Sequence, residues 1–281
     1  DGLRCDMAML MCNDIFARTW GGTPPAEEYW PPLIARVKAA YPEFLFIAEA
    51  YWDMEWTLQQ QGFDYAYDKR LYDRLREHHA KPVREHFLAG LDYQDKLARF
   101  LENHDEPRAA ATFPPGVHEA AAVLTFLSPG LRFLHQGQLE GRTKRISPHL
   151  GRGPNEPTNA AIQQFYQRLL TILKQPVLRD GAWQLLECTP GWDGNWTQDN
   201  LIAFAWQRDT GERLIVAVNY SPNQSQGHVR LPLADLAGKP WRLHDQVSGA
   251  NYDWNGDDLV GRGLYLDLTP WQAAVLEPRL S

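Results

Sequence analysis

The chain has 281 residues, of which 44% are hydrophobic, and a formal net charge of −7. This composition is rich enough in apolar residues to build a sizeable core, and it excludes a largely disordered chain. The negative charge argues against nucleic acid and anionic membranes as partners, and the longest apolar stretch, around Ala120–Leu127, is too short to span a bilayer. The three cysteines show neither metal-binding spacing nor a disulfide framework.

The first part of the chain alternates between strand-like and helix-like segments. The strand-like runs are short and β-rich, at Leu3–Ala8, Phe44–Tyr51, Phe63–Tyr67, Ala98–Asn103 and Leu131–Leu134. The helical patterns cover Ala26–Ala40, Asp68–His79, Val117–Leu127 and Asn159–Lys174. Such alternation with compact connections is typical of parallel α/β architecture. Five strands with helices between them fit either a doubly wound sheet or part of an eight-stranded barrel.

After about Pro176 the pattern changes to short runs with alternating apolar positions, separated by turn-forming residues. These runs are Trp183–Cys188, Leu201–Gln207, Arg213–Asn219, His228–Leu231, Trp241–Gln246, Gly263–Leu268 and Trp271–Glu277. They predict an antiparallel β-sandwich of roughly 100 residues. We therefore expect two domains, an α/β domain over residues 1–176 and a β-sandwich over residues 177–281.

Polar side chains follow three of the predicted parallel strands, where α/β folds place their ligand sites. The first strand carries Arg4 and Asp6, two positions apart, and the alternation of a strand would place both on one face. The second is apolar until Glu49, which Tyr51 and Trp52 follow. The fourth runs into three polar residues, Asn103, His104 and Asp105. Three carboxylates are thus predicted at one rim of the sheet.

A pair of carboxyl groups can cleave an acetal, because one donates a proton to the leaving oxygen and the other captures the oxocarbenium-like carbon. Arg4 would orient Asp6 as the nucleophile, Glu49 would be the acid, and the rings of Tyr51 and Trp52 could stack on sugars. Other interpretations stay open for each motif: a structural ion pair at Arg4 and Asp6, a helix cap at Glu49, and an ordinary turn at residues 103–105. A divalent metal on His104, Asp105 and a second histidine is a further alternative, although no paired-histidine spacing supports it.

Taken together, these segments resemble the alpha-amylase family of retaining glycoside hydrolases and transglycosylases. DGLRCDMA is similar to the family's fourth-strand segment, with Arg4 and the nucleophile Asp6, and FIAEAYW is similar to the fifth-strand segment, with the acid/base Glu49. ENHDEPR is similar to the seventh-strand segment, which implies that His104 contacts the sugar and Asp105 holds its secondary hydroxyls. The resemblance covers the whole chain.

The resemblance implies a fold made of the C-terminal portion of a TIM (β/α)8 barrel, about five strand–helix units, followed by an antiparallel β-sandwich. We interpret the chain as a fragment that begins on the fourth barrel strand and lacks the N-terminal half of the barrel. A partial barrel leaves outer strands unpaired, so we expect the isolated chain to be weakly stable and poorly active.

One departure from the family concerns the residues after the nucleophile. Many amylases carry a Lys-His pair three and four positions later, where this chain has Met9 and Leu10. The difference favours short α-glucosides or glucosyl transfer over long, starch-type leaving groups.

The resemblance thus implies a retaining glycosidase or transglycosylase that acts on an α-glucan or a short α-glucoside through a covalent intermediate on Asp6. We expect neither a cofactor nor a metal ion, no nucleic-acid or membrane partner, and the missing N-terminal half of the same protein as a partner. A non-catalytic carbohydrate-binding or scaffold relative is the alternative. A phosphorylase-type enzyme that uses inorganic phosphate as acceptor is a third hypothesis.

Overall fold

The computed structural model describes residues 1–281, which pack as two compact units. The first unit contains Asp1–Asp73, Ala89–Phe100 and Pro129–Phe133, and the second contains Arg74–Leu88, Leu101–Ser128 and Leu134–Ser281. The predicted domain boundary between residues 176 and 177 stays a prediction.

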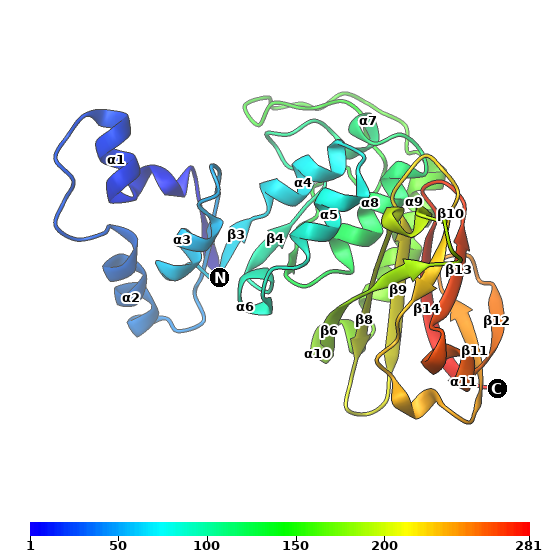
Figure 1. Ribbon diagram of the computed structural model, residues 1–281. Helices are drawn as coiled ribbons and strands as arrows, with labels where there is room; N and C mark the ends of the chain where they lie inside the picture. Colours follow the sequence, from blue (N-terminus) through cyan, green and yellow to red (C-terminus); the bar gives the residue numbers. More distant parts are fainter. The chain divides into compact units, whose positions relative to one another are not determined.

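The first unit is built on a parallel sheet in which each strand pairs with the next one along the chain (Figure 1). Its five strands are β1 (Gly2–Cys5), β2 (Leu45–Ala48), β3 (Tyr65–Tyr67), β4 (Leu97–Arg99) and β5 (Leu131–Arg132). No strand position is skipped in this order. The wall of a barrel has the same order, because each helix or loop returns the chain to the position next to the preceding strand. The parallel ladder brings the C-terminal ends of all five strands to one edge.

The parallel strands are shorter than the sequence predicts, and the first shows why. The predicted strand Leu3–Ala8 ends at Cys5, because Met7 has a φ of 42° and a left-handed conformation that a strand cannot contain. A single 3₁₀ turn, η1 (Ala8–Met11), follows. The other predicted parallel strands likewise included loop residues at their ends. Asp6 therefore lies just beyond the strand rather than on it.

Helices are present in both units. The first unit contains α1 (Asn13–Trp20), α2 (Trp30–Ala40), α3 (Glu55–Gln60), α6 (Leu91–Gln94) and the start of α4 (Lys69–Arg76). The second unit contains α5 (Ala80–His86), α7 (Ala109–Thr112), α8 (Val117–Phe126), α9 (Ala160–Leu173), α10 (Val177–Asp180) and α11 (Gly256–Gly261). None of these helices is both long and apolar enough to cross a membrane.

The core of the first unit lies beneath the ends of β1 and β2. Phe46, Ala48 and Phe63 are buried there together with Met9 of the turn η1. The indole N–H of Trp30 donates a hydrogen bond of 2.8 Å to the Ala8 carbonyl. This bond holds the turn after β1 against helix α2, and it fixes the backbone on which the following site is built.

The second unit contains two antiparallel sheets (Figure 1). Their strands are β6 (Ala182–Leu186), β7 (Cys188–Pro190), β8 (Leu201–Gln207), β9 (Arg213–Asn219), β10 (Ser225–Val229), β11 (Pro240–Asp245), β12 (Asn251–Asn255), β13 (Leu264–Leu268) and β14 (Ala273–Leu280). One sheet has the order β12-β11-β14-β9-β8-β6 and the other the order β13-β10-β7. Short 3₁₀ turns, η2 (Thr197–Asn200) and η3 (Ala234–Leu236), connect some of them.

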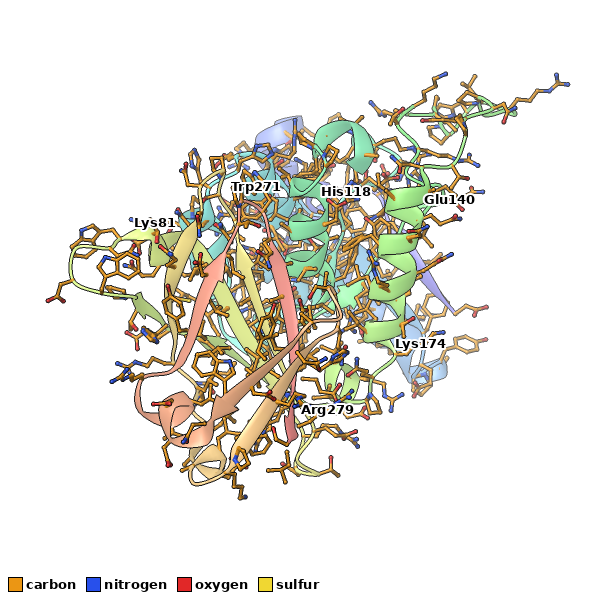
Figure 2. All side chains as sticks on the ribbon, turned by 90° about the vertical axis from the view of Figure 1, so that its right-hand side faces the viewer. Lys81, His118, Glu140, Lys174, Trp271 and Arg279 are labelled. Atoms are coloured by element: carbon orange, nitrogen blue, oxygen red, sulfur yellow. The ribbon has the colours of Figure 1, made fainter.

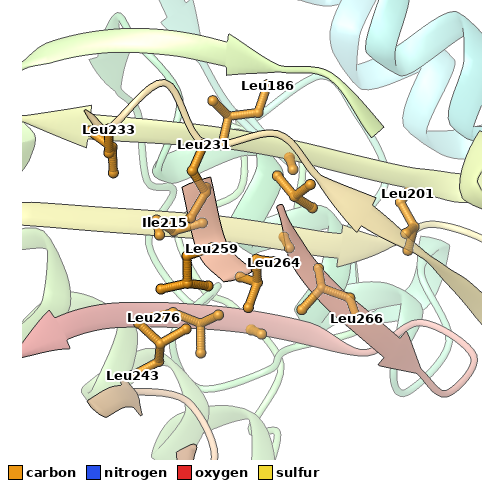
Figure 3. Close-up of a cluster of buried hydrophobic side chains, with 14 of the residues drawn as sticks. Leu186, Leu201, Ile215, Leu231, Leu233, Leu243, Leu259, Leu264, Leu266 and Leu276 are labelled. Carbon is orange, nitrogen blue, oxygen red and sulfur yellow. The ribbon is translucent and has the colours of Figure 1, made fainter. Parts of the chain in front are cut away.

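Leucine and isoleucine side chains from several of these strands fill the core of the sandwich (Figure 3). Ile215, Leu243, Leu264 and Leu276 are at most 2% exposed. Strand alternation directs these side chains into the space between the two sheets. Helix α8 is tied to this unit, because the indole N–H of Trp206 on β8 donates a 2.7 Å hydrogen bond to the Leu127 carbonyl.

A buried carboxyl group, Glu55 at the start of α3, gives the first unit a predicted pH dependence. Burial raises the pKa of Glu55 from its usual value of 4.5 to about 7, and the charges of Asp68 and Asp53 act in the same direction. Because the folded state binds the Glu55 proton more tightly than the unfolded state does, this group's contribution to stability is fully present below pH 4.5. The contribution is lost as the pH rises through about 7.

We expect Glu55→Gln to remove this dependence. The free energy of unfolding of the wild type should fall, relative to the variant, by about 2–3 kcal/mol between pH 4.5 and 8. Urea unfolding at several pH values measures the difference, with Glu43→Gln, a change at an exposed glutamate, as the control. Parallel pH curves for the wild type and Glu55→Gln would contradict the prediction.

Candidate active site

Arg4, on β1, contacts both carboxylates of the first unit's predicted site. Its Nη1 forms an ion pair with Asp6, and its Nη2 lies 2.9 Å from Oε1 of Glu49. Asp6 follows β1 and Glu49 follows β2, and the parallel register that pairs Cys5 with Ala48 sets the two side by side. One guanidinium group therefore links two carboxylates that lie 43 positions apart in the sequence.

The two carboxylates have different surroundings. The side chain of Asp6 is 78% exposed, whereas that of Glu49 is 5% exposed. The second oxygen of Glu49, Oε2, accepts a 2.6 Å hydrogen bond from the backbone N–H of Met7. This bond needs the left-handed turn at Met7, so the same backbone feature ends β1 and orients Glu49. An exposed carboxylate beside a fixed, buried one is an arrangement in which the two can take different chemical roles.

Tyr67, on β3, is a third contact of Arg4 and was not predicted from the sequence. Its hydroxyl oxygen accepts a 3.4 Å hydrogen bond from Nε of Arg4, and the guanidinium carbon lies 5.5 Å from the centre of its ring. Phe100 and Phe133 pack against the ring, with centroid distances of 5.4 and 5.5 Å. Burial lowers the pKa of Arg4, but the bonds to Tyr67 and Asp6 outweigh it and raise that pKa. Arg4 is therefore a permanent, positioned cation.

The predicted aromatic residues lie in the loop after β2. Trp52 is 58% exposed and Tyr51 is half-buried against the core. Trp52 and Asp53 have φ values of 58° and 60°, so two consecutive residues adopt the left-handed conformation. Asp53 also forms an ion pair with Arg70. This tight turn presents the Trp52 indole to solvent, where a flat apolar face is available for stacking.

The remaining predicted site residues belong to the second unit, where they form their own cluster. His104 and Asp105 are partly exposed, and His104 Nε2 lies 3.0 Å from Asp105 Oδ2. Asn103 is buried, and its Oδ1 accepts hydrogen bonds from the N–H groups of Asp105 and Glu106, at 2.9 and 2.8 Å. Its side chain thus shapes the turn that carries the other two. The roles of all these residues in binding or catalysis stay predictions.

A buried network behind this turn was also missed by sequence reasoning. Glu102 accepts hydrogen bonds from Arg108 Nη1 at 2.5 Å and from the Ala109 N–H at 2.7 Å, and its Oε1 lies 3.0 Å from His135 Nδ1. Arg108 also donates to the Gln136 carbonyl at 2.7 Å. The only sequence signal is a charged residue, Glu102, directly after the apolar residues Phe100 and Leu101. No group of three or more His, Cys, Asp or Glu side chains is arranged to hold a metal ion.

Comparison with known proteins identifies what this arrangement is similar to. Residues 195–276 match the family model described as "GLGE, C-terminal". A curated protein, the alpha-1,4-glucan:maltose-1-phosphate maltosyltransferase of Bifidobacterium animalis subsp. lactis, is 28% identical over 275 residues. The match covers 86% of this chain and 35% of that protein. The chain resembles the C-terminal part of proteins of the alpha-amylase family. The resemblance drawn from the sequence is thereby confirmed.

Solved structures of alpha-amylase-family proteins have the same fold. An Anoxybacillus alpha-amylase superposes with a TM-score of 0.74 at 16% identity, covering 100% of this chain and 59% of that one. A debranching enzyme from Nostoc punctiforme, soaked with acarbose, gives a TM-score of 0.65 at 22% identity, covering 99% and 57%. The predicted fold class, part of a TIM barrel followed by an antiparallel sandwich, is confirmed. The chain spans about a third of the curated relative and less than two thirds of these structures.

The departure after Asp6 has a structural counterpart. Met9 is fully buried in the core of the first unit, and Leu10 packs against the same core. Both side chains therefore contribute to the packing of the first unit.

Proposed function

We propose that this chain contributes the nucleophile and the acid/base to a retaining enzyme of the alpha-amylase family that acts on α-glucosidic linkages. The observation that carries the proposal is the contact of Arg4 with both Asp6 and Glu49. Retaining glycosidases need two carboxyl groups about 5–5.5 Å apart, and carboxylates that share one guanidinium are held close together. The glucan-active relatives support the coarse assignment.

In the first step of the proposed reaction, the Asp6 carboxylate attacks the anomeric carbon and the bond to the leaving group breaks. Glu49, protonated, gives its proton to the oxygen of the leaving group, sugar or phosphate, and so becomes a carboxylate. In the second step, Glu49 takes a proton from an acceptor hydroxyl whose oxygen displaces Asp6. Two inversions at the same carbon retain the α configuration. For His104 and Asp105, in the second unit, sugar binding is proposed from the sequence resemblance alone.

Transfer to a sugar is the favoured outcome over hydrolysis. The curated relative is named a maltosyltransferase that uses maltose 1-phosphate, and the residues at positions 9 and 10 are apolar where many amylases carry a Lys-His pair. We therefore propose that the complete protein, to which this chain contributes the C-terminal part, moves an α-glycosyl unit onto a glucan acceptor.

The proposal is tested by incubating the full-length protein with maltose 1-phosphate, with and without a short glucan. Phosphate release that depends on the glucan, together with an α-linked product by NMR, supports transfer. If the same amount of phosphate were released without the glucan, the reaction would be hydrolysis. A β-configured product would exclude the covalent intermediate on Asp6, and saturable glucan binding without any turnover would favour the carbohydrate-binding alternative.

Tyr67 is predicted to position Arg4. Tyr67→Phe keeps the ring beneath the guanidinium and should lower kcat/KM about 3–10-fold, whereas Tyr67→Leu removes the ring and should lower it about 10–100-fold. In Tyr67→Leu the acid limb of the pH–rate profile should also move to higher pH, because a loosened cation stabilises the carboxylates less. Tyr41→Phe, at an exposed tyrosine, is the control. Equal effects of Tyr67→Phe and Tyr67→Leu with an unmoved profile would indicate a purely structural role.

A further inference from the structure

A groove of about 770 Å³ lies within the second unit, between helix α9 and strands β11 and β14. Nine of its ten lining residues carry a polar group, and Ile172 is the exception: Gln164, Gln167, Arg168, Thr171, Ile172, Gln175, His244, Gln246, Glu277 and Arg279. Figure 2 labels Lys174, which directly follows α9, and Arg279 on β14, and so locates two of the elements that border the groove. A volume of this size is within the range that small-molecule sites occupy.

Side chains across one side of the groove are joined by hydrogen bonds. Gln175 Nε2 donates to Gln246 Oε1 at 2.5 Å, and Gln246 Nε2 donates to Glu277 Oε2 at 2.9 Å. Arg279 donates to both oxygens of Glu277, at 3.0 and 2.8 Å. The bond from Arg279 lowers the pKa of Glu277, with Gln246 and the nearby His244 acting in the same direction. These groups are thus fixed before any ligand arrives.

The other side of the groove is the polar face of α9. Gln164, Gln167, Arg168 and Thr171 are exposed there, whereas Phe165, Tyr166 and Leu169 of the same helix are buried. Arg168 has no ion-pair partner, while the charge of Arg279 is balanced by Glu277. The groove therefore has an excess of positive charge, located at Arg168.

We propose that this groove is a binding site for a phosphorylated saccharide. The four carboxamides can each donate and accept hydrogen bonds, which matches sugar hydroxyls, since these also do both. The unpaired guanidinium of Arg168 is the complement of a phosphate group. No Phe, Tyr or Trp lines the groove, so a ligand is held mainly by polar contacts and charge. The inference does not depend on the proposed function.

Isothermal titration calorimetry on the full-length protein tests the proposal. The probes are glucose 6-phosphate and glucose 1-phosphate, with inorganic phosphate and maltose as separate arms. Saturable binding of a sugar phosphate below about 1 mM is expected, with at least tenfold weaker binding of phosphate and of maltose. If inorganic phosphate bound as tightly as the sugar phosphates, the groove would be a site for anions in general. If maltose bound as tightly as they do, the phosphate group would not contribute to recognition. No binding of either sugar phosphate would overturn the proposal.

Variants locate the binding. Arg168→Gln, at an exposed position on α9, should weaken the sugar phosphate at least tenfold without changing the unfolding temperature. Gln246→Leu breaks the hydrogen-bonded side and should weaken binding as well. Arg262→Gln is the matched control, because Arg262 is exposed in the same unit and does not line the groove. Binding that survives both groove variants unchanged would show that the ligand binds elsewhere.

Discussion

Replacing Asp6 by Asn in the full-length protein is expected to lower the rate of glycosyl transfer at least about 10⁴-fold, the order of loss seen when a covalent nucleophile is removed. The amide is neutral and cannot form the glycosyl ester, but it has nearly the same shape and can still accept a hydrogen bond from Arg4. Because the Asp6 side chain is 78% exposed, the fold should be unaffected. Initial rates with maltose 1-phosphate and a glucan measure the effect.

Asp14→Asn is the matched control, since Asp14 is an exposed aspartate of the first unit in helix α1. It should leave the rate within about twofold of the wild type. Sugar binding by Asp6→Asn should persist. If Asp6→Asn retained more than about one per cent of the wild-type rate, Asp6 would not be the nucleophile, and the role of Arg4 in holding two catalytic carboxylates would be lost with it.

The sandwich was predictable because burial and turn residues both mark its strands. The boundaries of β8 and β9 agree with the sequence, since a buried apolar run is followed in each case by a turn such as residues 209–211. Strand β12 (Asn251–Asn255) was missed because its residues are mostly exposed and polar, and pairing with β11 defines it. Such an edge strand has no burial pattern to detect.

The first parallel strand shows a different limit. The sequence places Arg4 and Asp6 together by strand alternation, and the two side chains do form an ion pair. The reason is different, however, because the strand ends at Cys5 and a left-handed Met7 follows. A methionine in a sequence does not indicate a left-handed conformation. In the structure this conformation goes together with the hydrogen bond from the Met7 N–H to Glu49.

Contacts between side chains of different strands were the least predictable part of the site. Tyr67 reaches Arg4 only because the register of β1, β2 and β3 aligns their ends. Asn103 is predicted to bind substrate, and its side-chain oxygen also accepts hydrogen bonds from two backbone N–H groups, which the sequence does not indicate. The motif indicates which residues gather at the strand ends, whereas the register decides which of them meet.

Arg99→Met is expected to cause the largest loss of stability, because it leaves a carboxylate buried without its cation. Arg99 on β4 and Asp68 before α4 form an ion pair whose side chains are 0% and 1% exposed. Arg99 also donates to the Pro129 carbonyl at 3.0 Å and to Gln94 at 2.8 Å, and Asp68 accepts the N–H of Leu71 at 3.0 Å. Breaking such a pair by removing one partner costs about 3–5 kcal/mol.

Urea unfolding of the full chain measures this loss, and Arg179→Met is the matched control. The Arg179–Asp180 pair is exposed, with side chains 73% and 41% accessible, so its loss should change the free energy of unfolding far less than Arg99→Met does. Adding Asp68→Asn to Arg99→Met should recover part of the stability, because the unpaired charge is then gone while an oxygen that can cap α4 is kept. The double variant therefore separates the cost of a buried charge from the loss of packing by the arginine side chain. If both single arginine variants were destabilised equally, or if the double variant recovered nothing, burial of the ion pair would not be what makes Arg99 important to the first unit.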